Sequence, residues 1–223
     1  MIGTNYGTQT FYSTLTFRLL LDALARPGKI NQLESPQFWG EAPSYSSQAT
    51  ERDTTINLHA LGALLALLDR ETTFVMGANG QWFDRAEAAV RWTMLRSGST
   101  LANPDQASFA FFCDGGNNEL FAQLSVGTLL EPELSATAFF CVEQLADDLS
   151  MTHEEGITLE LRGPGIQDVS TIHVAGLQAS TLEAILFARK SYPLGIDVYL
   201  IDGAGCCVGL PRTTKIQLRA ETR

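Results

Sequence analysis

Lysine is scarce in this sequence: Lys29, Lys190 and Lys215 are the only three, and the formal net charge is −10. With so little positive charge, the chain has no extended basic surface for nucleic acid. Any anion must therefore be held by a local group of donors. Long apolar runs are missing as well, because charged residues interrupt each stretch before the roughly 20 residues that a bilayer span requires. We therefore expect neither nucleic acid nor a membrane among the partners.

Secretion signals and patterns of paired cysteines are also lacking. Residues 1–5 show no basic region followed by an apolar stretch. The cysteines lie far apart or side by side, which fits neither a dense disulfide framework nor a C-x-x-C zinc site: Cys113, Cys141, Cys206 and Cys207. We predict a cytoplasmic protein with reduced thiols and no metal site, in which the last two cysteines are ordinary core residues of a strand.

The common catalytic motifs are absent too. The sequence has no phosphate-binding loop, nucleophile elbow, zinc-protease helix or dinucleotide fingerprint. Its histidines, His59, His153 and His173, have no partner at metal-ligand spacing, and His59 is expected to be a hydrogen-bonded core residue. The sequence leaves open whether the chain is an enzyme, because no self-contained catalytic site can be identified.

Apolar periodicity alternates between helical and strand spacing along the chain. Helical spacing predicts helices over 12–25, 54–68, 86–96 and 118–124, and one more from a capping box at Ser180–Glu183. Strands are predicted over 72–76, 107–113, 137–142, 157–161, 170–174, 196–201 and 206–210.

Residues 35–50 have no periodicity, so we expect an extended connection, docked by Phe38 and Trp39. The whole pattern predicts one α/β domain over residues 1–223, with a mixed sheet flanked by helices.

Five donors are the best candidates for an anion site: Arg26, Lys29, Arg212, Thr213 and Thr214. The first two flank a tight turn, and the last three follow a proline directly after a buried strand. A guanidinium with hydroxyl donors can hold phosphate or phosphonate oxygens, and the two groups could converge. A structural ion pair of Arg212, with threonines that simply fill a strand, would explain the same residues. The sequence alone leaves both interpretations open.

Six segments, in order along nearly the whole chain, resemble the H subunit of the bacterial carbon-phosphorus lyase system for phosphonate breakdown. They include Arg26-Pro27-Gly28, Leu68-Asp69-Arg70-Glu71-Thr72, Glu131-Pro132-Glu133, Leu161-Arg162-Gly163-Pro164-Gly165-Ile166, Pro193-Leu194-Gly195-Ile196-Asp197 and Leu210-Pro211-Arg212-Thr213-Thr214. At Arg96 many relatives carry a histidine, so we transfer no acid–base role to this position.

The resemblance implies a homodimer whose fold is similar to that of pyridoxal-phosphate-dependent transferases but lacks the cofactor site. It also implies assembly with G, I and J subunits into a core complex. There the chain would support synthesis of α-D-ribose 1-methylphosphonate 5-triphosphate from ATP and methylphosphonate as a non-catalytic scaffold. The alternatives are a phosphate-, phosphonate- or nucleotide-binding catalytic subunit that uses Arg26 and the segment from Arg212 to Thr214, and an independent transferase with a degenerate cofactor site.

Overall fold

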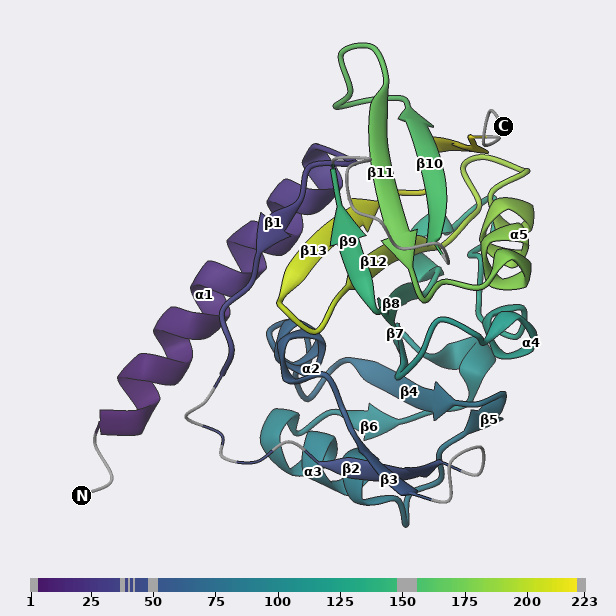
Figure 1. Ribbon diagram of the computed structural model, residues 1–223. Coiled ribbons are helices and arrows are strands. Elements are labelled where there is room, and N and C mark those ends of the chain that lie inside the picture. The colour runs from purple at the N-terminus through teal and green to yellow at the C-terminus, as the bar shows by residue number, and fades with distance from the viewer. Residues whose placement is uncertain are drawn as a thin grey trace.

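A computed structural model of the protein describes residues 4–36, 39, 41, 43–47, 52–147 and 156–219 (Figure 1). Phe38, His153 and parts of the predicted 35–50 connection lie outside these residues.

The main sheet has eight strands in the order β1-β13-β12-β8-β7-β4-β5, with β6 pairing β4. Its centre is parallel and consists of β4 (Thr73–Ala78), β7 (Phe109–Phe112), β8 (Thr137–Cys141) and β12 (Asp197–Ile201). The flanking strands are β1 (Asn31–Gln32), β13 (Cys206–Leu210), β5 (Gln81–Trp82) and β6 (Thr100–Leu101). The antiparallel pairs β12–β13, β1–β13 and β4–β5 make the sheet mixed, as predicted.

A second, antiparallel sheet stands against the first in the order β14-β10-β11-β9. Its strands are β9 (Gln144–Ala146), β10 (Gly156–Arg162), β11 (Ser170–Ala175) and β14 (Lys215–Leu218). A separate hairpin joins β2 (Ser44–Ser47) to β3 (Arg52–Thr55). The helices are α1 (Thr4–Ala25), α2 (Leu58–Leu65), α3 (Ala88–Ser97), α4 (Asn118–Phe121) and α5 (Ala179–Ala188). Across the described residues, no helix is long and apolar enough to cross a membrane.

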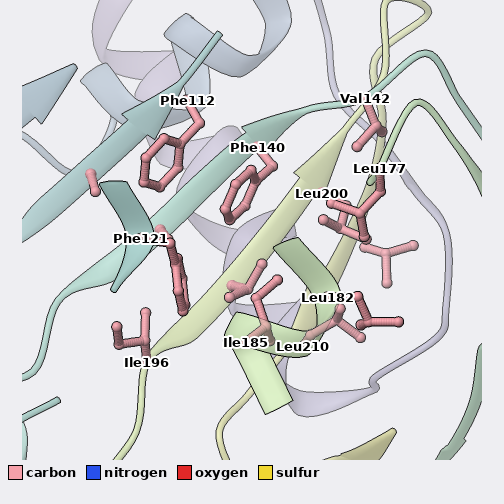
Figure 2. Packing of buried hydrophobic residues seen from close by; sticks show 14 of the residues in the cluster. Phe112, Phe121, Phe140, Val142, Leu177, Leu182, Ile185, Ile196, Leu200 and Leu210 are labelled. Atoms are coloured by element: carbon pink, nitrogen blue, oxygen red, sulfur yellow. The ribbon is translucent and has the colours of Figure 1, made fainter. Parts of the chain in front are cut away.

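The parallel strands are buried on both faces, which explains their nearly continuous apolar sequences. One face packs against α1, α2 and α3, and the other packs against α4, α5 and the second sheet. In β7, Phe111 points to the first side and Phe112 to the second, and Phe139 and Phe140 do the same in β8. Figure 2 shows the second face, where side chains of α5 meet the phenylalanines of the sheet.

The long helix α1 lies along one edge of the molecule, and its N-terminal end extends away from the body (Figure 1). Its C-terminal half crosses β13 at Gly209, where a β-carbon would come within 2.6 Å of the Ala23 carbonyl carbon. The Tyr199 hydroxyl donates to the Leu20 carbonyl at 3.1 Å and fixes the helix to the centre of the sheet. Only glycine fits at position 209, because a side chain there would collide with the backbone of α1.

Several boundaries differ from the predicted ones for local reasons. The helix predicted over 54–68 begins only at Leu58, because the Asn57 side chain accepts from the backbone amides of His59 and Ala60 and so caps it. The capping box at Ser180–Glu183 is wrong: the N-cap of α5 is Gln178, and it makes no side-chain cap bond. His59 is not the hydrogen-bonded core residue that the sequence predicts, because it is only half-buried and its Nδ1 atom has no hydrogen-bond partner.

Part of the predicted 35–50 connection docks as expected. Trp39 makes edge-on ring contacts with Tyr12 and Trp92, with ring centroids 5.6 and 5.9 Å apart. The Arg96 guanidinium lies 3.9 Å from the Trp92 ring and donates to the Trp39 carbonyl at 2.9 Å. Arg96 therefore holds this segment against α3, which is a structural role. The paired strand Ser44–Ser47 shows that the segment is not extended connection alone.

Candidate functional site

The two most distinctive segments near the end of the sequence meet at the amino-terminal end of β12. The β12–β13 register places Val198 opposite Leu210, so Asp197 and Arg212 follow as neighbours beyond the paired residues. The Asp197 carboxylate accepts from the Arg212 backbone amide at 2.7 Å and from the Arg212 side chain through Nη2 at 3.0 Å and Nε at 3.4 Å. The structural ion pair of Arg212, one of the two interpretations that the sequence leaves open, is thus present.

Arg212 lies in a turn between β13 and β14. The Thr214 amide donates to the Pro211 carbonyl at 2.8 Å and closes this turn. The remaining terminal nitrogen of Arg212, Nη1, donates to the Pro132 carbonyl at 2.8 Å. Thr213 and Thr214 therefore precede β14 rather than fill a strand, and the bidentate edge of Arg212 is occupied by Asp197.

A second guanidinium, Arg189, lies beside this ion pair just after α5. Its Nη2 atom donates to the Leu210 carbonyl at 2.6 Å and to the Ile196 carbonyl at 3.2 Å. Its Nε and Nη1 atoms are inaccessible to solvent and have no partner. Burial lowers the pKa of Arg189 to about 10, Asp197 opposes this change, and the positive charge of Arg212 adds to it.

Both arginines line a cavity of about 540 Å³ between α5 and the β13–β14 turn. Lys215 contributes a third cation to its wall, and Thr214 contributes a hydroxyl. The Thr214 side chain is only 4% exposed, and its Oγ1 atom has no hydrogen-bond partner. The cavity therefore combines positive charge with polar donors that the fold leaves unused.

Of the five predicted donors, Arg212, Thr213 and Thr214 line this cavity, and Arg26 and Lys29 do not. Both of these pair with Asp22 of α1, and the Lys29 ammonium lies 2.8 Å from its Oδ2 atom.

The predicted turn is present, because the Lys29 amide donates to the Arg26 carbonyl at 3.1 Å and Gly28 has φ +86°. The Gly163–Gly165 turn packs between the two groups: Gly165 approaches the Ala25 carbonyl, and Gly163 approaches Thr213.

Arg189 is not among the predicted site residues, because a cation that follows a helix is fully explained by the helix dipole. Its role depends on how α5 packs over the β12–β13 hairpin. A usable signal lies in the two predicted strands over 196–201 and 206–210: paired as the hairpin β12–β13, they bring Asp197 next to the turn that holds Arg212.

A different cavity of about 340 Å³ lies at the carboxyl ends of the parallel strands. Its wall includes Asn57, Cys113, Asp114, Cys141 and Glu143. Burial, aided by the negative charge of Asp114, raises the pKa of the Cys113 and Cys141 thiols. These cysteines are free thiols that stay protonated, so they are not activated nucleophiles.

Asp114 at this edge is engaged in local backbone contacts. Its carboxylate accepts from the amides of Asn79 at 2.8 Å and Gly116 at 2.9 Å, and from the side chain of Asn117. Asp202, beside the same edge, is 2% exposed and accepts from the amides of Leu145, Ala204 and Cys206 at 2.9–3.1 Å.

The fold and the cavity that is lined by Arg189 and Arg212 define an α/β protein with a positively charged pocket at the amino-terminal edge of its parallel strands. A family profile described as bacterial phosphonate metabolism protein (PhnH) matches residues 5–217. The chain therefore belongs to the PhnH family.

Two relatives agree with this assignment. The alpha-D-ribose 1-methylphosphonate 5-triphosphate synthase subunit PhnH of Rhizobium meliloti is 30% identical over 95% of this chain and 94% of its own length. The putative C-P lyase subunit protein HtxG of Stutzerimonas stutzeri is 33% identical over 71% of this chain and 75% of its own length.

Proposed function

We propose that this chain is a cytoplasmic subunit of a carbon-phosphorus lyase core complex. In that complex it supports synthesis of α-D-ribose 1-methylphosphonate 5-triphosphate as a scaffold for the G, I and J subunits. Membership of the PhnH family carries the proposal, because both relatives bear names of subunits. The four free cysteines support the location, since such thiols persist in reducing compartments.

The long helix α1 offers a surface for assembly because it is apolar on two sides. Leu20 and Ala23 pack on the body of the protein. Phe11, Phe17 and Leu21 project outward and are 71%, 44% and 52% exposed. Large apolar side chains that are exposed together on one face mark an interaction surface, so we expect a partner to cover this outer face.

A second copy of the chain is the partner that we propose for this outer face. Two chains of formal charge −10 repel one another over most of their surfaces. The single carboxylate of α1, Asp22, is already paired with Arg26 and Lys29. Self-association through α1 therefore avoids like-charge contact, and a two-fold axis would place the same apolar face on both sides of the interface.

We further propose that the chain acts without pyridoxal phosphate, although its mixed sheet with a parallel centre supports a likeness to the transferases that use it. Such enzymes bind the cofactor through a lysine. All three lysines lie away from the carboxyl ends of the parallel strands: Lys29 pairs with Asp22, Lys190 lies over the Phe187 ring, and Lys215 begins β14. Added pyridoxal phosphate should therefore give no aldimine absorption.

The deciding experiment is co-expression with the G, I and J subunits followed by size-exclusion chromatography. We expect wild type to co-elute with them and to elute alone as a dimer. The variant Leu21→Asp should elute alone as a monomer, because it places a charge on the apolar face of α1. Leu95→Asp is the matched control, since Leu95 is 83% exposed on α3.

A well-folded wild-type chain that eluted apart from the three subunits would contradict the subunit proposal. Turnover of ATP and methylphosphonate by the isolated chain would contradict the scaffold role. An unchanged dimer in Leu21→Asp would move the interface away from α1 and leave the assembly with other subunits to be judged separately.

A further inference from the structure

The second sheet ends in an edge strand, β14, whose outer side is unpaired. In the order β14-β10-β11-β9, the only strand beside β14 among the described residues is β10. A strand at the edge of a sheet presents a row of N–H and C=O groups to which another chain can pair, and proteins normally cover or interrupt such edges. The open side of β14 is therefore a candidate surface for a partner.

The register of β14 against β10 identifies the backbone groups on this open side. The Arg219 amide donates to the Thr158 carbonyl at 2.9 Å, so these two opposite residues form a hydrogen-bonded pair. Hydrogen-bonded and non-hydrogen-bonded pairs alternate along an antiparallel ladder, so Ile216 and Leu218 direct their N–H and C=O groups away from β10. Within the described part of the chain, these groups have no other backbone partner. They are the groups to which an added strand would pair.

Open space lies next to these groups. The cavity of about 540 Å³ is lined by the successive residues 213–217, and Leu186 of α5 lies on its opposite wall. Lys215 and Ile216 belong to opposite faces of β14, and no residue of β10 is among the described lining residues. The cavity therefore runs along the outer edge of β14. A peptide strand as long as β14 spans about 13 Å and occupies a width of about 4.8 Å, which suits this space.

The charge beside this edge favours an acidic segment. Arg162 of β10 lies directly opposite Lys215 of β14, and both side chains are exposed. Like charges that face each other across a ladder are destabilising, and neither cation forms an ion pair among the described residues. The described lining residues of the cavity include no carboxylate. An acidic side chain on a strand added beside Lys215 would offset the repulsion, whereas a basic one would increase it.

The two faces of β14 differ, which defines the pattern of the added strand. Ile216 packs into the core cluster on the inner face, whereas Lys215 and Gln217 are exposed on the outer face. On the inner side the cavity offers Leu186 and Tyr192 as wall, and Tyr192 is 70% exposed. Side chains alternate between the two faces of a sheet. The segment therefore alternates apolar residues toward α5 with acidic residues toward solvent.

We propose that an extended acidic segment of another protein adds to β14 as a further strand of the second sheet. Its backbone pairs with the outward groups of Ile216 and Leu218, its carboxylates lie beside Lys215, and its apolar side chains lie on Leu186. This inference goes beyond the scaffold role and does not rest on it, because the edge and the cavity are formed within one chain.

Nuclear magnetic resonance on the isolated protein tests the site. The probe is the peptide Glu-Val-Glu-Val-Glu, acetylated and amidated so that its ends carry no charge, added to the ¹⁵N-labelled chain up to millimolar concentration. We expect the amide signals of Ile216 and Leu218 to shift, and their exchange with solvent to slow several-fold, because these amides gain acceptors. Absence of both changes at β14 would overturn the proposal.

Two altered peptides separate strand pairing from simple charge attraction. The same acidic peptide with every backbone nitrogen methylated cannot donate hydrogen bonds to β14, so we expect it to bind at least several-fold more weakly. The basic analogue Lys-Val-Lys-Val-Lys keeps its backbone donors but should bind more weakly as well, because it faces Arg162 and Lys215. Equal binding of the methylated peptide would exclude strand addition. Equal binding of the basic peptide would contradict the choice of an acidic partner.

Variants of β14 provide the second measurement. Leu218→Pro removes an outward amide that β10 does not use, which an edge strand tolerates, and should weaken peptide binding about tenfold. Leu218→Ala is the matched control, because it keeps this amide, and should bind as wild type does. Lys215→Glu should reverse the preference from the acidic to the basic peptide, and it stays compatible with the fold because Arg162 lies opposite.

The variant Lys215→Glu decides the result if Leu218→Pro fails to fold. Unchanged binding by both variants would exclude the site. Shifts of Ile216 and Leu218 that appear on raising the protein concentration without peptide would mean that two copies of β14 pair, which would overturn the proposed occupant. Because the isolated chain is measured, these failures would leave the subunit proposal standing. Conversely, failed co-elution with the G, I and J subunits would leave the edge of β14 untouched.

Discussion

The two edges of the parallel strands carry opposite kinds of polar chemistry. At the carboxyl edge, Asp114 and Asp202 accept from surrounding backbone amides, and the local charge is negative. At the amino edge of β12, Asp197 faces two arginines, and donors of Arg189 and Thr214 remain without partners. At the carboxyl edge the carboxylates are satisfied by backbone amides, whereas at the amino edge donor atoms of Arg189 and Thr214 have no hydrogen-bond partner.

This difference runs against the usual rule for open α/β sheets, in which ligands bind outside the carboxyl ends of the strands. Here part of that edge is packed closely: a β-carbon on Gly115 would collide with the Gly176 carbonyl, and Asp202 fastens the β12–β13 turn to β9, beside the cavity of about 340 Å³. The cavity with the greater number of cations therefore lies at the edge opposite to the one that this rule predicts. The site has to be located from the charges and donors of this chain.

The largest expected effect is at the carboxyl edge. Asp202→Ala removes a buried carboxylate that satisfies three backbone amides, so we expect a loss of about 3–5 kcal/mol of unfolding free energy in urea titrations. Asp202→Asn keeps one acceptor oxygen and should lose about half as much. A loss below about 1 kcal/mol for the alanine variant would mean that this edge is not held by its carboxylate.

The next largest effect is at the amino edge. Asp197→Asn leaves Arg189 and Arg212 without their shared counter-charge, and we expect about 2–3 kcal/mol of destabilisation, since both side chains of the ion pair are about 80% buried. Urea titrations of the variant and wild type measure this loss. A loss below about 1 kcal/mol would mean that the two arginines do not depend on the Asp197 carboxylate.

Alkaline pH should weaken one edge and spare the other. Burial raises the pKa of Cys141 and Cys207 well above the value near 9 that the unfolded chain has. The unfolded state therefore releases these protons first, and the stability that the neutral thiols contribute below pH 9 is lost above it, by about 1.4 kcal/mol per thiol between pH 8 and 10. Arg189, whose pKa is lowered to about 10, loses about half of its charge by pH 10, and because its unfolded pKa is higher it offsets only a small part of the loss.

Urea titrations at pH 8 and pH 10 measure this effect. The Cys141→Ala variant should lose less stability across the interval than wild type does, by about 1.4 kcal/mol. Identical losses in the two proteins would show that the thiol at the carboxyl edge is not the titrating group.

The sequence identified Arg212 and Thr214 at the amino edge, but neither Arg189 nor how these residues are combined. Strands over 196–201 and 206–210 were predicted, and the register of the hairpin that they form places Asp197 beside Arg212. The unused donors of Arg189 could not be predicted, because they depend on the packing of α5 over strand carbonyls distant in the sequence. The strand β14 was missed since it has only four residues and one buried side chain, Ile216.

The smallest expected effect concerns charge at the carboxyl edge. Burial is the main cause of the raised pKa of Cys141, and the negative charge of Asp114 is the second. Asp114→Asn should therefore lower this pKa and speed alkylation of Cys141 by iodoacetamide at pH 8, by less than about tenfold because burial remains. Cys207 is the internal reference, since its pKa depends on burial, Asp202 and Cys206. Faster reaction of both cysteines would indicate local opening, whereas faster reaction of Cys141 alone would confirm that the carboxylate sets the negative character of this edge.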